Sequence, residues 1–175
     1  TSCVGTEGER EYFQLAMRLF PNIREANHAK KGLLGTMSEE TYYHNFLNRD
    51  RLIHIVDDDP TICEGLSVLF RLEGFQTAFS LEPSHFLAML ERRRADVAVI
   101  NLAVGEESGL PLLRRVKAMR TGTPVVMLAN VPQLDAAVTA MKLGATDVVS
   151  KPIDSEHLLS IVRDALRRDV HLGAM

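Results

Sequence analysis

The chain contains no tryptophan, only two cysteines and no large excess of either charge. Cys3 and Cys63 are too few for a disulfide framework or a metal cluster, so we expect a reducing compartment, the cytoplasm. A formal net charge of -3 at pH 7 provides no general attraction to nucleic acid or anionic membrane, and we expect neither to be bound directly. No apolar run reaches the ~20 residues of a membrane-spanning helix. These absences exclude a disulfide-stapled domain and a membrane span from the sequence.

Hydrophobic residues make up 46% of the 175 residues, which is enough for one full core. From residue 52 onward, short apolar runs alternate with longer amphipathic stretches, a pattern typical of strand and helix units on a parallel sheet. The third and fourth apolar runs show little polar alternation, which predicts strands covered by helices on both faces. The predicted strands are residues 52–56, 75–79, 97–101, 124–129 and 146–150.

Five helices are predicted between and after these strands. Asp59 followed by Pro60 predicts an N-cap with proline at the first helical position, and Gly74 ends that helix. Further helices are predicted to begin at Pro83, about Gly109, near Gln133 and after Asp154. The residues expected to face inward are Ile62, Leu66 and Leu69 in the first helix, Phe86, Leu87 and Leu90 in the second, Ala137, Val138 and Met141 in the fourth, and Leu158, Val162, Ala165 and Leu166 in the fifth.

The chain therefore divides into an α/β domain over residues 49–170, a short tail at 171–175 and an N-terminal extension at 1–48. The extension has one predicted helix, residues 9–20, whose apolar positions cover more than one narrow stripe. Too apolar to stand alone in water, this helix docks on the domain or on a second subunit, or else belongs to a fused segment. Met37 is a candidate native start under the second interpretation.

Charged and polar side chains follow several of the predicted strands. Ligands of an open parallel sheet sit beyond the carboxyl ends of its strands. Asp57 and Asp58 follow the first strand and Lys151 follows the fifth. Two carboxylates can seat a divalent cation that prefers oxygen ligands, and a lysine across the crevice can neutralise a phosphoryl oxygen. The alternative is that the acidic run only precedes and caps a helix.

Three motifs resemble one known family. They are "IVDDDP" at 55–60, "SGLPLLRRVK" at 108–117 and "AVTAMKLGATDVVSKPID" at 137–154. Residues 52–168 resemble the receiver domain of bacterial two-component response regulators, and especially receivers that precede LuxR-type DNA-binding domains. The resemblance implies a flavodoxin-like fold with a five-stranded parallel sheet in the order 2-1-3-4-5.

The resemblance assigns roles to six positions. Asp57 and Asp58 fall on the acidic pair that binds magnesium in the family, and Lys151 falls on the lysine that contacts the phosphoryl group. The Lys151-Pro152 bond is a candidate cis peptide. The other three positions differ: the phosphoacceptor aspartate is replaced by Asn101, the Ser/Thr sensor by Ala129 and the aromatic switch by Val148.

These replacements change what the crevice can do. An amide is a poor nucleophile, so the phosphotransfer of a normal receiver is not expected at Asn101. The pocket loses one negative charge, which predicts weak magnesium binding and no required cofactor. Ala129 lacks the hydroxyl that would read a phosphoryl oxygen, and Val148 lacks a ring to switch.

We therefore predict a pseudo-receiver that is not an enzyme and that acts without phosphorylation, either as a homodimer or with another regulatory protein. One alternative is a phosphoacceptor that uses Asp57 or Asp58 with magnesium. Another is the N-terminal regulatory half of a DNA-binding transcription factor. The expected contact surface consists of the helix near 133–144, the strand at 146–150 and the helix after 154, and it offers Gln133, Asp135, Lys142, Asp147, His157 and Arg163.

Two further residues allow more than one interpretation. His54 lies within the first strand, where a core histidine with satisfied hydrogen bonds is favoured over a ligand. Cys63 lies one turn beyond the acidic loop, where a buried thiol is favoured over a redox sensor.

Overall fold

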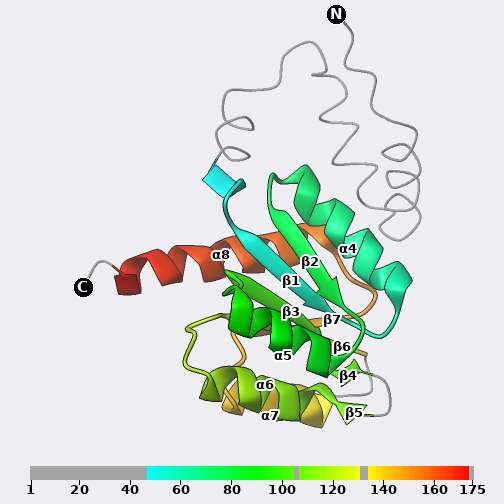
Figure 1. The fold of residues 1–175 in the computed structure, drawn as a ribbon. Helices are drawn as coiled ribbons and strands as arrows, with labels where there is room; N and C mark the ends of the chain where they lie inside the picture. The colour runs from blue at the N-terminus through cyan, green and yellow to red at the C-terminus, as the bar shows by residue number, and fades with distance from the viewer. Residues whose placement is uncertain (1–46, 105–106, 131–133, 174–175) are drawn as a thin grey trace, which may run out of the picture.

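The computed structural model describes residues 47–104, 107–130 and 134–173 (Figure 1). The predicted helix at 9–20, Met37 and Gln133 lie outside this part of the chain. No helix of the described residues combines the length and the apolar character needed to cross a membrane.

A parallel sheet of five strands forms the centre of the molecule (Figure 1). Its spatial order is β2-β1-β3-β6-β7, which in chain order is the predicted 2-1-3-4-5, so the fold class is confirmed. All four strand pairs are parallel. Each strand begins within one residue of its prediction. The strands are β1 (Leu52–Val56), β2 (Gln76–Ser80), β3 (Val97–Asn101), β6 (Val125–Ala129) and β7 (Asp147–Ser150).

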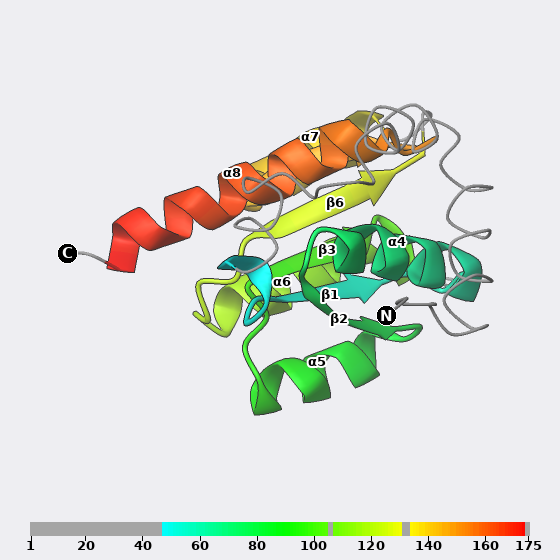
Figure 2. The same ribbon diagram turned by 90° about the horizontal axis from the view of Figure 1, so that it is seen from above.

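Helices cover both faces of this sheet (Figures 1 and 2). One core cluster joins one face of the sheet to α4 and α8, and a second joins the opposite face to α5, α6 and α7. Because β1, β3 and β6 are buried on both faces, they consist almost entirely of apolar residues. The helices are α4 (Pro60–Leu72), α5 (Pro83–Arg92), α6 (Gly109–Ala118), α7 (Leu134–Lys142) and α8 (Ser155–Gly173), the last of which continues past Arg168.

The predicted helix signals are present at α4. The Asp59 side chain accepts a hydrogen bond of 2.8 Å from the Thr61 N–H, which caps the first turn, and Pro60 is the first helical residue. Gly74 follows the helix with φ of 90°, a left-handed conformation that glycine adopts without strain. The inward stripes predicted for α5 and α8 are buried as expected.

The predicted inward stripe of α7 is wrong. Val138 and Met141 are 47% and 48% exposed, whereas Ala140 is fully buried. Ala136 and Leu143 pack with Ala140 against the core, at the i, i+4 and i+7 spacing of one helix face. The sequence carries two apolar stripes on this helix, and the smaller side chains of the alanine stripe allow the closer approach to the sheet.

A short hairpin that was not predicted, with two residues in each strand, connects β3 to α6. β4 (Ala103–Val104) pairs antiparallel with β5 (Glu107–Ser108). The chain then enters α6 at Gly109, where an added Cβ would lie 2.4 Å from the Asn101 carbonyl oxygen. Only glycine allows the start of α6 to pack this closely against the end of β3.

Candidate functional site: a crevice at the carboxyl edge of the sheet

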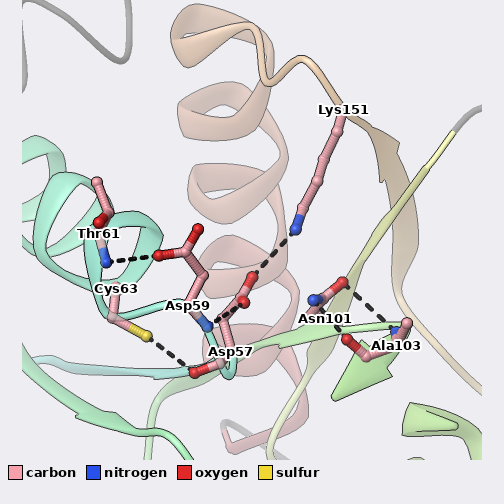
Figure 3. A network of polar contacts seen from close by, with 7 residues as sticks. All are labelled: Asp57, Asp59, Thr61, Cys63, Asn101, Ala103 and Lys151. Carbon is pink, nitrogen blue, oxygen red and sulfur yellow. Dashed lines mark hydrogen bonds and ion pairs between the residues drawn. The ribbon is translucent and has the colours of Figure 1, made fainter. Parts of the chain in front are cut away.

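The predicted site residues come together where the strand order reverses, between β1 and β3. Asp57 follows β1, Asn101 ends β3 and Lys151 follows β7. Figure 3 shows Lys151 reaching across the crevice to Asp57, with Asn101 beside them. Residues separated by up to 94 positions in sequence thus share one pocket.

Asp57 is the buried acid of this pocket. Its side chain is 1% exposed, and both carboxylate oxygens are occupied. Oδ1 accepts 3.0 Å from the Asp59 N–H, and Oδ2 accepts 3.1 Å from Lys151 Nζ (Figure 3). Burial raises the pKa of Asp57, while the Asp59 hydrogen bond and the Lys151 charge limit that rise. The carboxylate is held by the protein itself.

Lys151 is positioned by the backbone around it. Its N–H donates 2.7 Å to the Ala129 carbonyl, which extends the β6–β7 pairing by one residue. The Lys151-Pro152 peptide is cis, so that prediction is confirmed. The lysine side chain remains 20% exposed, so its ammonium group binds Asp57 while part of the side chain still meets water.

Asn101 is bound to its own loop. The amide Nδ2 donates 2.6 Å to the Ala103 carbonyl, and Oδ1 lies 3.5 Å from the Ala103 N–H (Figure 3). The side chain is almost fully buried. This pairing requires an amide donor, because a carboxylate in the same orientation would direct an oxygen at a carbonyl oxygen. Sequence reasoning missed Ala103 because a backbone partner leaves no signal in side-chain identity.

The remaining predicted positions contribute little polarity to the crevice. Ala129 is buried at the end of β6, and Val148 packs in the cluster on the α7 side. Asp58 is exposed beside the pocket. Among the described residues, no group of three histidine, cysteine or acidic side chains is arranged to hold a metal. The Lys151 ammonium group already neutralises Asp57 and Asn101 adds no negative charge, so these residues fit a magnesium ion poorly.

Two other residues lie close to the crevice. The Cys63 thiol donates 3.4 Å to the Asp57 carbonyl, and burial raises its pKa to about 12, which keeps the sulfur protonated and unreactive. His54 is buried on β1, and its Nε2 lies 2.8 Å from Ser80 Oγ, which in turn lies 2.8 Å from His85 Nδ1. Burial lowers the pKa of His54 to about 4. Both are core residues with hydrogen-bond partners, as expected.

The predicted contact surface is only partly assembled. Asp135, Lys142 and His157 are exposed and Asp147 is half-buried, whereas Gln133 lies outside the described residues. Arg163 is half-buried, and its guanidinium donates 2.7 Å to Glu73 at the end of α4, so its charge is already paired within the domain.

The fold and the crevice together are those of a doubly wound α/β protein with a charged site at its switch point. Residues 53–163 match the family described as "Response regulator receiver domain". The chain belongs to this family.

Relatives agree with that assignment. "DNA-binding response regulator MtrA" of Mycolicibacterium smegmatis is 34% identical over 121 residues, which are 69% of this chain and 52% of the relative. "Response regulator protein TodT" of Pseudomonas putida is 30% identical over 128 residues, 73% of this chain and 56% of the relative. The chain thus spans about half the length of these relatives.

The fold agrees as well. A response regulator receiver domain from Clostridium thermocellum superposes with a TM-score of 0.67 at 25% identity, over 70% of this chain and 98% of that one.

Proposed function

We propose that this receiver domain is a pseudo-receiver, which transmits signals through protein contacts and carries out no phosphotransfer of its own. The observation that carries the proposal is the hydrogen bonding of the Asn101 side chain. Its amide is bonded to Ala103, and the lysine of the crevice is bonded to Asp57 instead. The amide at the end of β3 is not a nucleophile, and the ammonium group of Lys151 is bonded to Asp57.

Charge supports the same conclusion. Lys151 already supplies the positive charge that Asp57 needs in its buried position. A magnesium ion at Asp57 would have to share that carboxylate with the Lys151 ammonium group, whose positive charge repels it, and Asn101 would offer it only a neutral amide. We therefore infer weak magnesium binding and no enzymatic activity.

Incubation with a small acyl phosphate and magnesium tests this proposal, with intact-mass spectrometry as the readout. The unmodified chain should gain no phosphoryl group. A stoichiometric gain would overturn the proposal, and its loss in Asp58→Asn would then identify the exposed carboxylate as the acceptor. The Asn101→Asp variant, run in parallel, reports whether the rest of the crevice is still competent.

The signalling contact that we propose is a second copy of this chain on the α7, β7 and α8 surface. Val138 and Met141 expose apolar side chains on α7, Asp135 and Lys142 are exposed charged residues on the same helix, and His157 is exposed on α8. An apolar centre with a charged rim suits a symmetric interface.

Sedimentation of charge variants tests this contact. Met141→Glu should shift a dimer toward monomer by burying an unpaired charge, whereas Leu81→Glu, an equally exposed site beyond the end of β2, should not. An identical association constant for both variants, or a monomer at every concentration of the unmodified chain, would remove this surface from consideration.

A second proposal concerns the whole protein. Because the relatives are about twice as long and one is a DNA-binding regulator by name, we infer that this domain acts in transcription regulation as one part of a longer chain. Sequencing the complete coding region tests this. A stop codon directly after residue 175 would exclude an output domain on its C-terminal side.

A further inference from the structure

The middle of α4 is buried around its whole circumference, unlike the other helices, although both ends of α4 are exposed. Residues 65–70 form a run of six buried positions, which is longer than the 3.6 residues of one helical turn. In α5, α6, α7 and α8, no more than two described residues in succession are buried. The sheet can cover only one face of a helix, so a second contact must cover the outer face of α4.

Val68 identifies that outer face. At 100° per residue it lies opposite the stripe of Cys63, Leu66 and Phe70 that packs on the sheet. It is nevertheless only 9% exposed, and it belongs to neither core cluster. Ser67, beside it, is also buried, and its hydroxyl has no hydrogen-bond partner within the part of the chain that the structure describes.

The start of the described chain lies next to this helix. The Asn48 side chain donates 2.9 Å to the Glu73 carbonyl at the end of α4, and Gln76 donates 2.8 Å to the Arg49 carbonyl. Leu47 and Leu72 are both close to half exposed. The preceding 46 residues therefore reach the domain at the C-terminal end of α4.

We propose that residues 9–20 of this chain dock on the outer face of α4 around Val68. Their apolar side chains extend around more than one stripe and need a partner. Residues 21–46 can span up to ~90 Å when extended, far more than the ~20 Å length of α4. The occupant thus comes from the same chain, and its reach is sufficient without a second subunit.

The docked segment would act on the crevice through α4. The first turn of this helix holds the acidic loop through Cys63. Its thiol donates to the Asp57 carbonyl, and its backbone N–H donates to the Asp59 carbonyl. The outer contact therefore stabilises the helix that fixes Asp57. This inference does not depend on whether Asn101 can be phosphorylated.

Limited trypsin digestion of the full chain tests the contact. In the unmodified protein, cleavage after Arg18 should be slow. Val68→Glu should accelerate it by more than tenfold, whereas Ala88→Glu, on the exposed outer face of α5, should leave the rate unchanged. Val68→Ala, which keeps the helix and removes only two methyl groups, should accelerate it by about tenfold and covers the case in which the glutamate variant does not fold.

A cysteine pair identifies the occupant. With Cys3 replaced by serine, Leu15→Cys combined with Val68→Cys should form a disulfide within one chain, independent of protein concentration. A cross-linked dimer would assign the surface to a second copy and overturn the proposal. Equal cleavage after Arg18 in the unmodified, Val68→Ala and Ala88→Glu proteins would do the same, because it would leave residues 9–20 undocked.

Discussion

Two pairs of strands contribute to the crevice, and their polar groups are satisfied differently. Asp57 after β1 and Lys151 after β7 form an ion pair that spans the two strands between them, β3 and β6. At the end of β3, Asn101 bonds to a residue two positions away, and Ala129 at the end of β6 offers no polar side chain. The first pair ties the ends of two separate strands together, whereas Asn101 is bonded within its own loop.

This difference shows which part of a receiver crevice has a structural use apart from phosphorylation. A buried carboxylate needs a partner whether or not it holds a metal, and Lys151 is that partner here. The end of β3 needs only a residue that satisfies the turn into the hairpin, and an amide does so. The acidic residue and the lysine alone are therefore a weak indicator of phosphotransfer.

Breaking the ion pair should have the largest effect. Lys151→Met leaves Asp57 buried without its counter-charge, and we expect the free energy of unfolding to fall by about 3 kcal/mol at pH 7. Removing Lys151 raises the pKa of Asp57 further. An acid whose pKa is raised by folding loses stability as pH rises through that pKa, so the deficit should shrink toward pH 4. Urea unfolding at several pH values measures this.

The control for this variant is the more exposed pair. Arg163→Met removes the partner of Glu73, and it should cost less than about 1 kcal/mol with little dependence on pH. Equal losses in the two variants would contradict the structural role of the crevice pair.

His54, within β1, should make the next largest contribution to the pH dependence of stability. Folding lowers its pKa from 6.5 to about 4, so its contribution is present above pH 6.5 and is lost as pH falls toward 4. Between pH 7 and 4.5 the loss should be about 2 kcal/mol. His54→Leu should remove that part of the acid sensitivity. Thermal unfolding at both pH values gives the result, and an unchanged pH dependence in the variant would contradict it.

Asn101→Asp tests the bond between the end of β3 and its own loop. The new carboxylate oxygen would face the Ala103 carbonyl, and we expect a loss of about 1.5 kcal/mol that magnesium partly restores. Asn48→Asp is the matched control, because the Asn48 amide also donates to a carbonyl but far from the crevice. Chemical unfolding with and without magnesium separates them. Recovery by magnesium in both variants would show that the ion does not act at the crevice.

The smallest effect is expected at Ala129. Ala129→Ser places a hydroxyl at the end of β6, where the crevice offers polar partners, so the cost should be below about 1 kcal/mol. Ala98→Ser, inside β3 and fully buried, should cost about twice as much because no partner is at hand. The ratio of the two losses in urea unfolding checks this, and a larger loss at position 129 would show that the crevice is drier than the structure indicates.

Much of the fold could be predicted because its signals are local. Runs such as residues 97–101 are apolar and β-branched, which identifies buried strands, and Asp59 with Pro60 marks the start of a helix. The orientation of α7 could not be predicted, because both Val138 with Met141 and Ala136 with Ala140 form plausible stripes. Only the distance between the helix and the sheet distinguishes them.

The candidate site divides in the same way. Its position followed from the rule that strand ends meet at one edge, and Asp57, Asn101 and Lys151 lie there. The partners could not be predicted. Gly109 carried a signal, a glycine directly after the Ser108 cap, but the close approach to Asn101 appears only when the end of β3 and the start of α6 are placed together.

The amino-acid sequence fixes the chemical groups of the crevice, since position 101 carries an amide and position 151 an amine. The bonds that these groups form depend on the folded arrangement of the chain. Lys151 bonds to Asp57 because burial leaves that carboxylate as the group most in need of a positive charge, and α7 turns Ala140 rather than Met141 inward because the smaller side chain allows a closer approach to the sheet. Both depend on distances between segments far apart in the chain, which no local pattern encodes.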